Sequence, residues 1–508
     1  MRISCHPRWF IRWGLVFTFS LALLACLTPA VAAASPGPLV HRSTYHSPLS
    51  QGKDRSSNVL GSVAGKVSIM PGFPVMTTET PGTYQAGPGI NVLVGDITGD
   101  GKPDFLATSL ANGPLYAWEP DGTVIPGWPT TQFTGAAYAT LGKLSKTIPG
   151  LQVMVGYMNG DLAAFDGHGH LLPGWPIKGP NYTATPPMLA DINGDGIDEI
   201  FVEEENWTLA GYNAQGKPLP GWPVHVDTAQ QVFTPTVADI DGDGKPEIIA
   251  GSQPSSPGGG KVYAWHGDGT LVKGFPITVL NGLEETFPVV ADVLGLGKPQ
   301  VIFEAIDPNN RNNTQVLIYS GAGKLLKTIT IPGTTYYGRA LAIARLDNSS
   351  NPDIVVQTET TLAVVHGNGS YVSGWPQKLS NGSGINSSPV VGDVTGDGVP
   401  DIAITTNMGS DQGTVLVYSA KGTLEFQMQL EIGAGGVPAM VDLLGNGRND
   451  LLVTGDPWDG SVHQYPKVWA FDFHGAGPYG KVPWAQFGRN PEHHSCFPTR
   501  GTSNFCTG

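Results

Sequence analysis

Short apolar runs alternate with segments rich in Asp and Gly along most of the chain. The first such unit has apolar runs at Val92–Val94, Phe105–Ala107 and Leu115–Trp118, followed by Gly127-Trp128-Pro129. Runs this short, bounded by Gly, Asp and Pro, predict strands joined by tight turns. Each unit therefore predicts four strands, and the fourth carries the Gly-Trp-Pro sequence because proline is tolerated at the edge of a sheet.

The unit is repeated. Its loops return every 46 to 53 residues and begin at Asp96, Gly142, Asp191, Asp239, Asp292, Arg345, Asp393 and Asp442. Four-stranded units in series are typical of the blades of a propeller. We expect an all-β fold, a single β-propeller of four-stranded antiparallel blades over residues 70–490. Eight blades are favoured, and seven remain an alternative because the last unit, ending at Val482–Phe487, is irregular.

The start of the repeat region predicts how the ring closes. Gly72-Phe73-Pro74 matches the fourth-strand sequence but precedes the first loop. This strand has no unit of its own. We expect it to complete the blade formed by the last repeat, so that the N- and C-terminal segments pair and leave no open sheet edge between them.

Four loops have a common arrangement of oxygen donors. They carry donors at positions 1, 3, 5 and 9 and glycine at positions 4 and 6, and they span Asp96–Asp104, Asp191–Glu199, Asp239–Glu247 and Asp393–Asp401. Calcium binds about 6 to 8 oxygen ligands, and glycine permits the positive φ that a tight loop needs. An EF-hand would need an acid at position 12, where these loops have Ala or aliphatic residues. Turn chemistry alone is the alternative, but it does not require donors at the same four positions.

The repeats resemble the integrin-α type family of FG-GAP (VCBS) repeats, over about residues 72–490. The resemblance implies Ca²⁺ held between the first and second strands of the blades, about four ions in this chain, and we expect an exported protein of bacterial origin. The ligand positions then fall on Asp96, Thr98, Asp100, Asp104, Asp191, Asn193, Asp195, Glu199, Asp239, Asp241, Asp243, Glu247, Asp393, Thr395, Asp397 and Asp401.

The other loops depart from this pattern. The loops that begin at Gly142, Asp292 and Arg345 lack donors at several positions and are expected to bind nothing. The loop Asp442–Asp450 keeps three donors but has Leu444 at position 3. Its occupancy stays open.

The N-terminus predicts export. Residues 1–33 carry Arg2, Arg8 and Arg12, an apolar run at Gly14–Leu27 and a cluster of small residues, which is the layout of a secretory signal. The run is shorter than the roughly 20 residues that span a bilayer. We expect no membrane span and a secreted or cell-surface/periplasmic protein, with lipoprotein anchoring through Cys26 as an alternative. Residues 34–69 are predicted to be a flexible linker because they are rich in Ser, Gly and Pro.

Charge and cysteine content restrict the partners. The net charge of −14 becomes −17 without the three arginines of the signal, which argues against nucleic acid. The only cysteines beyond the signal are Cys496 and Cys506, which predict a disulfide in the tail 491–508. His493 and His494 are interpreted as part of this closing segment.

These features favour a binding protein over an enzyme. No Ser-His-Asp arrangement has a diagnostic local context, and the Trp residues of the Gly-Trp-Pro sequences are expected to pack between blades more readily than to bind sugars. We expect a monomeric, non-enzymatic binding or adhesion scaffold for an extracellular protein or glycan. A calcium-dependent polysaccharide lyase is the alternative from another class.

Overall fold

The computed structural model describes 59–60, 66–76, 91–108, 114–130, 136–157, 159–178, 186–204, 208–226, 229–254, 260–279, 286–335, 339–379, 387–406, 413–431, 433, 436–455, 467–475, 480–486, 488–490 and 494–496. The chain divides into two compact units, Met1–Asp54 and Arg55–Gly508. Every described residue belongs to the second unit. The secretory signal predicted for residues 1–33 lies outside the described residues.

Eight antiparallel sheets follow one another in the second unit, and we number them blades 1 to 8. The strands of the first four blades are, in blade 1, β4 (Val92–Gly95), β5 (Asp104–Thr108) and β6 (Leu115–Trp118); in blade 2, β7 (Ala136–Gly142), β8 (Gln152–Tyr157), β9 (Asp161–Phe165) and β10 (Ile177–Lys178); in blade 3, β11 (Met188–Ala190), β12 (Glu199–Glu204), β13 (Thr208–Tyr212) and β14 (Val224–His225); and in blade 4, β15 (Ala229–Val232), β16 (Thr236–Ala238), β17 (Glu247–Pro254), β18 (Gly260–Trp265) and β19 (Ile277–Val279).

The other four blades repeat this order. Their strands are, in blade 5, β21 (Val289–Ala291), β22 (Gln300–Ile306), β23 (Asn313–Ser320) and β24 (Leu325–Pro332); in blade 6, β26 (Ala342–Ala344), β27 (Asp353–Gln357), β28 (Thr361–Val365) and β29 (Gln377–Lys378); in blade 7, β30 (Val390–Gly392), β31 (Asp401–Thr406), β32 (Thr414–Ser419), β33 (Leu424–Gln429) and β1 (Val59–Leu60); and in blade 8, β34 (Ala439–Val441), β35 (Asp450–Gly455), β36 (Lys467–Asp472), β2 (Ser68–Ile69) and β3 (Val75–Met76). A parallel pair, β20 (Thr286–Phe287) and β25 (Arg339–Ala340), joins blades 5 and 6.

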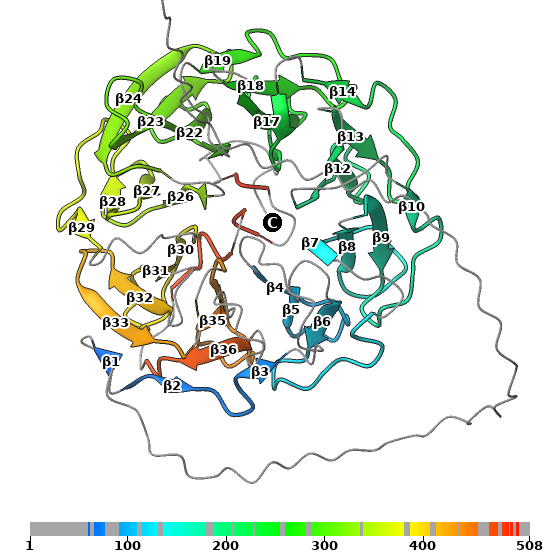
Figure 1. Cartoon of the computed structure of the whole chain (residues 1–508), viewed down its shortest axis with the longest axis horizontal. Helices are drawn as coiled ribbons and strands as arrows, with labels where there is room; N and C mark the ends of the chain where they lie inside the picture. The colour runs from blue at the N-terminus through cyan, green and yellow to red at the C-terminus, as the bar shows by residue number, and fades with distance from the viewer. Residues whose placement is uncertain are drawn as a thin grey trace, which may run out of the picture. The chain divides into compact units, whose positions relative to one another are not determined.

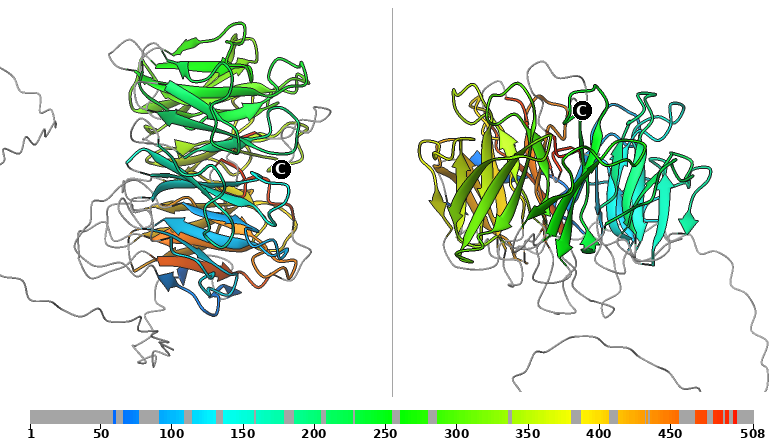
Figure 2. Two further views of the ribbon diagram at one scale, coloured as in Figure 1. Left: turned by 90° about the vertical axis from the view of Figure 1, so that its right-hand side faces the viewer. Right: turned by 90° about the horizontal axis from the view of Figure 1, so that it is seen from above.

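The blades form a closed ring (Figures 1 and 2). The first strand of each blade lies innermost, and inner strands of neighbouring blades contact each other at six junctions, including β34 with β4, which joins the last blade to the first. The central strands are buried along their length, as in β8 and β12. Strands buried on both faces read as continuous apolar runs, and this is the pattern seen in the sequence. The eight-bladed propeller is therefore confirmed.

The N-terminal segment closes blade 8. Val75 pairs with Val468 and Met76 with Lys467, so β3 completes the sheet of β36 directly after Gly72-Phe73-Pro74. The predicted closure is confirmed. β2 pairs with another part of β36, and β1 adds a fifth strand to blade 7. Both lie in the stretch 34–69, so ordered pairing begins earlier in the chain than the composition indicated.

The Gly-Trp-Pro sequences lie just before the fourth strands, not in them. In blade 2, for example, Trp175 and Pro176 precede β10. The indole of Trp175 is buried and donates a hydrogen bond from Nε1 to the carbonyl of Ala214 in blade 3, at 2.9 Å. Corresponding bonds join Trp128 to Gly167, Trp222 to Gly267 and Trp375 to Ala420. These tryptophans hold neighbouring blades together, as predicted.

The C-terminal segment lies at the centre of the ring, where Figure 1 shows it in red. Trp484 is fully buried and exchanges two backbone hydrogen bonds with Val391 of blade 7. The segment also bonds the inner strands of blades 8, 1, 3, 4 and 5, through Met440, Val94, Leu189, Val237 and Val290. One short segment thus ties six blades together.

Candidate metal centre

The predicted metal loops are the hairpins between the first and second strands of blades 1, 3, 4 and 7. The last residue of each first strand pairs with position 9 of the loop, as Gly95 pairs with Asp104 and Ala238 with Glu247. Position 9 therefore begins the second strand, inside the blade. The position-9 acids of all four hairpins are buried, namely Asp104, Glu199, Glu247 and Asp401.

The aspartate at position 1 shapes the loop. In blade 1, Asp96 accepts hydrogen bonds from the amides of Gly99 at 2.6 Å and Gly101 at 3.0 Å. Both glycines have positive φ, as predicted, and a Cβ on Gly99 would meet Pro149 of blade 2 at 2.5 Å. Equivalent bonds reach Asp191, Asp239 and Asp393 from the glycines at positions 4 and 6.

The residue at position 5 makes a local turn. Asp100 Oδ1 accepts from the amide of Lys102 at 2.8 Å, and Asp195, Asp243 and Asp397 accept from the corresponding amides. Such Asx turns form without any metal. Positions 1 and 5 are therefore explained by loop geometry alone, and the case for a cation depends on positions 3 and 9.

In blade 1, positions 3 and 9 keep unpaired oxygens. Asp104 Oδ2 accepts from the amides of Ile97 and Thr98, at 2.9 and 3.0 Å. Asp104 Oδ1 and the Thr98 hydroxyl oxygen are buried and have no hydrogen-bond partner. A buried oxygen without a partner costs about 1–3 kcal/mol. These two oxygens are the ones that a hard cation would satisfy.

Burial raises the pKa of the position-9 acids. The pKa rises to about 7 for Glu199, Glu247 and Asp401, and the pKa of Asp104 is also raised. Desolvation is the largest cause, and neighbouring loop carboxylates add to the effect. Ionised carboxylates in such surroundings favour a bound cation. The residues present therefore fit Ca²⁺.

Blade 4 brings the most carboxylates together. One oxygen each from Asp239, Asp241 and Asp243 lies within 4.8 Å of the others. Position 3 differs in blade 3, where the Asn193 amide donates to Glu199 Oε1 at 2.7 Å. In blade 7, Asp393 is fully buried and also accepts from the amide of Gly480, at 2.6 Å. Among the described residues, such a group of three loop carboxylates is found in blade 4 and not in the hairpins of blades 1, 3 and 7, whose predicted ligands share one loop but make different internal bonds.

Two of the hairpins expected to bind nothing contain an internal amide instead. In blade 5, Gln300 stands at position 9, and its Nε2 donates to Asp292 Oδ1 at 3.0 Å and to the carbonyl of Lys298. In blade 2, Gln152 Nε2 donates to the carbonyl of Gly150 at 2.9 Å. The pairing of Gly142 with Gln152 also shows that this loop starts at Lys143, one residue later than the sequence indicated.

Blades 6 and 8 contain basic side chains. Arg345 donates from Nη1 to the carbonyl of Ser350, and His366 Nδ1 lies 2.8 Å from Asp353 Oδ1. In blade 8, Asp450 Oδ1 is buried without a partner, as in blade 1. Arg448 of the same loop donates to Asp472, at 3.0 Å.

Other candidate residues lie near the ring centre. Cys496 is buried and disulfide-bonded, but Cys506 and His493 are outside the described residues, so their pairing and role stay predictions. His494 donates from Nε2 to the carbonyl of Leu189 at 2.9 Å, and burial lowers its pKa to about 4. It serves the closing segment, as interpreted. No local sequence signal indicated that His266 lies beside the blade 4 hairpin.

A family model matches two stretches of the chain. Residues 191–250 and 345–404 match the FG-GAP-like repeat, and each stretch runs from one hairpin to the second strand of the next blade. This chain is a β-propeller with FG-GAP-like repeats. Such a ring is, in general, a scaffold for binding.

Solved structures share the fold. The chain is similar to the Dos1 propeller, with 12% identity, a TM-score of 0.53 and coverage of 83% of this chain and 98% of that one. It is also similar to the biofilm matrix protein Bap1 of V. cholerae, with 12% identity, a TM-score of 0.43 and coverage of 85% and 96%. At this identity the likeness to the Dos1 propeller shows the fold alone. The chain has no significant match among curated proteins.

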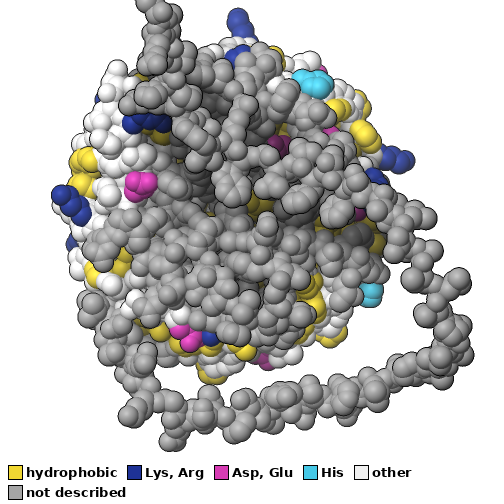
Figure 3. All heavy atoms as spheres, in the orientation of Figure 1, with side chains coloured by type: hydrophobic (Ala, Val, Ile, Leu, Met, Phe, Trp, Pro, Cys, Tyr) yellow, Lys and Arg dark blue, Asp and Glu magenta, His cyan; other side chains and the backbone are white. Residues whose placement is uncertain are grey.

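The part of the chain that the structure describes contains no helix that is long and apolar enough to cross a membrane. Described acidic and basic side chains are scattered around the rim on the face seen in Figure 3, and they form no single patch there.

Proposed function

We propose that this protein is an exported, calcium-stabilised propeller that acts as a non-enzymatic binding or adhesion scaffold for an extracellular protein or glycan. The observation that carries the calcium part is the pair of buried oxygens of Thr98 and Asp104 that have no hydrogen-bond partner. Turn chemistry explains the other carboxylates of that hairpin and leaves these two oxygens unexplained.

The proposed sites are in blades 1, 3, 4 and 7. Bound Ca²⁺ would neutralise the clustered carboxylates and link the loop to the buried start of the second strand. The aspartate at position 1 orients the loop through the glycine amides, and the acid at position 9 is held by the amide of position 2, as Glu247 is by Ile240 at 2.9 Å. The role of the metal is therefore to stiffen selected hairpins.

The centre of the ring supports a scaffold over an enzyme with a central cleft. Trp484 is fully buried, and the described residues of its segment bond to the inner strands of six blades. Ligands would then be bound by the outer loops, and the calcium-stiffened hairpins would fix the blades that carry those loops.

The ligand class is tested by arrays of glycans and matrix proteins, probed with the full chain in calcium and in chelator. We expect binding without turnover that is stronger in calcium. In parallel, a polysaccharide panel is assayed for unsaturated products. Product formation would overturn the non-enzymatic proposal, and absence of any array binding would overturn the scaffold proposal.

A further inference from the structure

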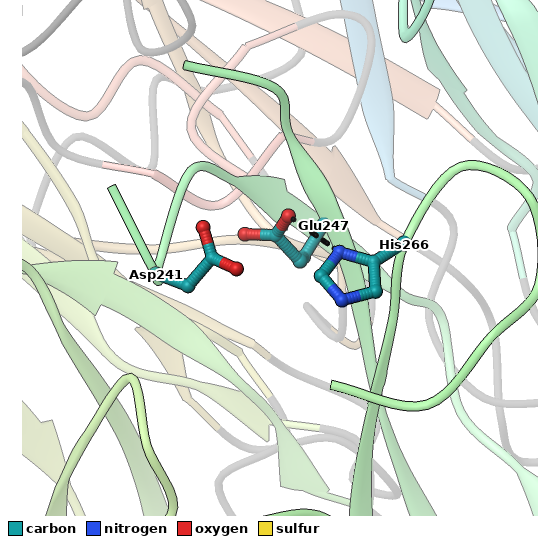
Figure 4. A group of neighbouring side chains, drawn as sticks. All are labelled: Asp241, Glu247 and His266. Atoms are coloured by element: carbon teal, nitrogen blue, oxygen red, sulfur yellow. Dashed lines mark hydrogen bonds and ion pairs between the residues drawn. The ribbon is translucent and has the colours of Figure 1, made fainter. Parts of the chain in front are cut away.

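A histidine stands beside the hairpin of blade 4. His266 directly follows β18, and its Nδ1 lies 3.2 Å from Glu247 Oε1. Figure 4 shows the imidazole of His266 and the carboxylates of Glu247 and Asp241 facing one another. One ligand atom from each of the three side chains lies within 4.8 Å of the others.

The spacing of these atoms suits a small metal ion. Two ligands at about 2.0–2.1 Å from a tetrahedral zinc ion lie about 3.3 Å apart. The 3.2 Å between His266 Nδ1 and Glu247 Oε1 is close to this value. Glu247 is fully buried, and its other oxygen, Oε2, is held by the amide of Ile240. Oε1 is therefore fixed in position. A metal ion that replaced the proton of the hydrogen bond between His266 and Glu247 would need no rearrangement of the strand.

The ring nitrogen of His266 favours a different metal from the one that the loop oxygens favour. Calcium takes oxygen ligands, whereas imidazole suits zinc and the neighbouring transition metals. Asp241 belongs both to the group with His266 and to the group with Asp239 and Asp243. The hairpin thus offers two overlapping ligand sets, one of oxygens only and one that includes nitrogen.

The hairpins of blades 1, 3 and 7 have no histidine at this place. The residue at the place of His266 is Glu119 in blade 1, Asn213 in blade 3 and Ser419 in blade 7. Ser419 is the last residue of its strand, whereas the other two directly follow theirs. Blade 6 has a histidine, His366, near Asp347 and Asp353. Its hairpin, however, begins with Arg345, which places a positive charge on the loop where blade 4 has Asp239. Blade 4 therefore has the more favourable charge for a divalent ion.

We propose that Asp241, Glu247 and His266 of blade 4 form a site for a divalent transition metal of the zinc class, in competition with Ca²⁺ at the same hairpin. The proposal deepens the proposed calcium function, because it shares two ligands with that site. It makes blade 4 the one of the four hairpins whose occupant depends on which metal is abundant.

The test is zinc titration by calorimetry of the tag-free, metal-depleted full chain. His266→Asn places in blade 4 the residue that blade 3 has, and His168→Ala, at an exposed histidine of blade 2, is the matched control. We expect one zinc site that is weakened about 10-fold or more by His266→Asn and unchanged by His168→Ala. Millimolar calcium should weaken zinc binding in the wild type.

Equal zinc affinity in the wild type and in His266→Asn overturns the proposal. Weakening by His366→Asn, with no effect of His266→Asn, overturns the assignment to blade 4. Calcium titration of the same proteins separates the two proposals. His266→Asn should keep its calcium sites, and a wild type that binds zinc through His266 but no calcium would overturn the proposed function alone.

Discussion

The hairpins of blades 1 and 5 have the same loop hydrogen bonds but differ at position 9, where blade 1 has the acid Asp104 and blade 5 has the amide Gln300. In both, the first aspartate accepts from loop amides, and the side chain at position 9 accepts from the start of the loop. In blade 5 the amide of Gln300 also donates to Asp292 and Lys298. In blade 1 the corresponding oxygen, Asp104 Oδ1, has no partner.

Under the proposed function, this difference would let the propeller keep its shape without a metal in every blade. The side-chain amide of Gln300 at position 9 donates hydrogen bonds to loop oxygens, at the place where a cation would otherwise bind. Gln152 does the same in blade 2. A carboxylate cannot donate when ionised, so under the proposed function a cation from solution takes this place in the hairpin of blade 1.

Removing calcium from the wild type should have the largest effect on this comparison. Each site contributes about 2.7 kcal/mol when calcium is 100-fold above its Kd, so loss of several sites should lower Tm by about 10 °C. Calorimetric scans in calcium and in chelator measure it. Identical scans would mean that the hairpins of blades 1, 3, 4 and 7 are as self-sufficient as those of blades 2 and 5.

Acid should destabilise the C-terminal segment, which is bonded to the inner strands of both blade 1 and blade 5. Burial lowers the pKa of His494 from 6.5 to about 4, so the unfolded chain takes up the proton first. The contribution of His494 is fully present above pH 6.5 and is lost as the pH falls towards 4, by about 1–3 kcal/mol. Urea unfolding at pH 7 and pH 5, compared between the wild type and His494→Asn, separates this loss from the titration of the position-9 acids, whose raised pKa acts in the opposite direction. His494→Asn should reduce it, and a loss that persists unchanged in the variant would contradict the role of His494.

Asp104→Asn places a side-chain amide at position 9 of blade 1, as Gln300 does in blade 5, and hardly changes the volume of the side chain. We expect one calcium fewer and unfolding in chelator that is no easier than in the wild type. Asp104→Ala is the contrast, because it leaves the amides of Ile97 and Thr98 without their acceptor and should cost about 1–3 kcal/mol. Urea unfolding in chelator compares the two. A common loss in both variants would mean that the amide does not replace the cation.

Gln300→Glu performs the reverse change. It removes the donor that faces Asp292 and places two carboxylates together, so stability at neutral pH should fall by about 1–2 kcal/mol. Calcium should not restore it, since Leu294 and Leu296 stand at positions 3 and 5. Urea unfolding with and without calcium checks both points. Rescue by calcium would show that the position-9 acid alone makes a site.

Local pattern predicted most of the fold because each blade is built from neighbouring segments. The strand spacing predicted eight blades, and the orphan Gly72-Phe73-Pro74 predicted the closure through β3. The position of the C-terminal segment could not be predicted, since Gln486 contacts Val94 across 392 residues and no periodicity records such a contact. The strand β1 was missed for the same reason.

The candidate sites were predicted only in part. The oxygen pattern identified the four hairpins, but it could not separate Asp96, which the loop itself needs, from Asp104, which keeps an unpaired oxygen. His266 lies 19 residues from its partner Glu247, in the next hairpin of the blade. A motif confined to nine residues cannot include it.

The central claim is that cations are held where position 9 is an acid with oxygen donors at positions 1 and 5, and that an internal amide in blades 2 and 5 or basic groups in blade 6 replace them. Calcium titration of the metal-depleted wild type by calorimetry tests it most directly. The account predicts about four Ca²⁺ per chain, or five if the hairpin of Asp442 is occupied. A count of zero, or one ion for every blade, would contradict it.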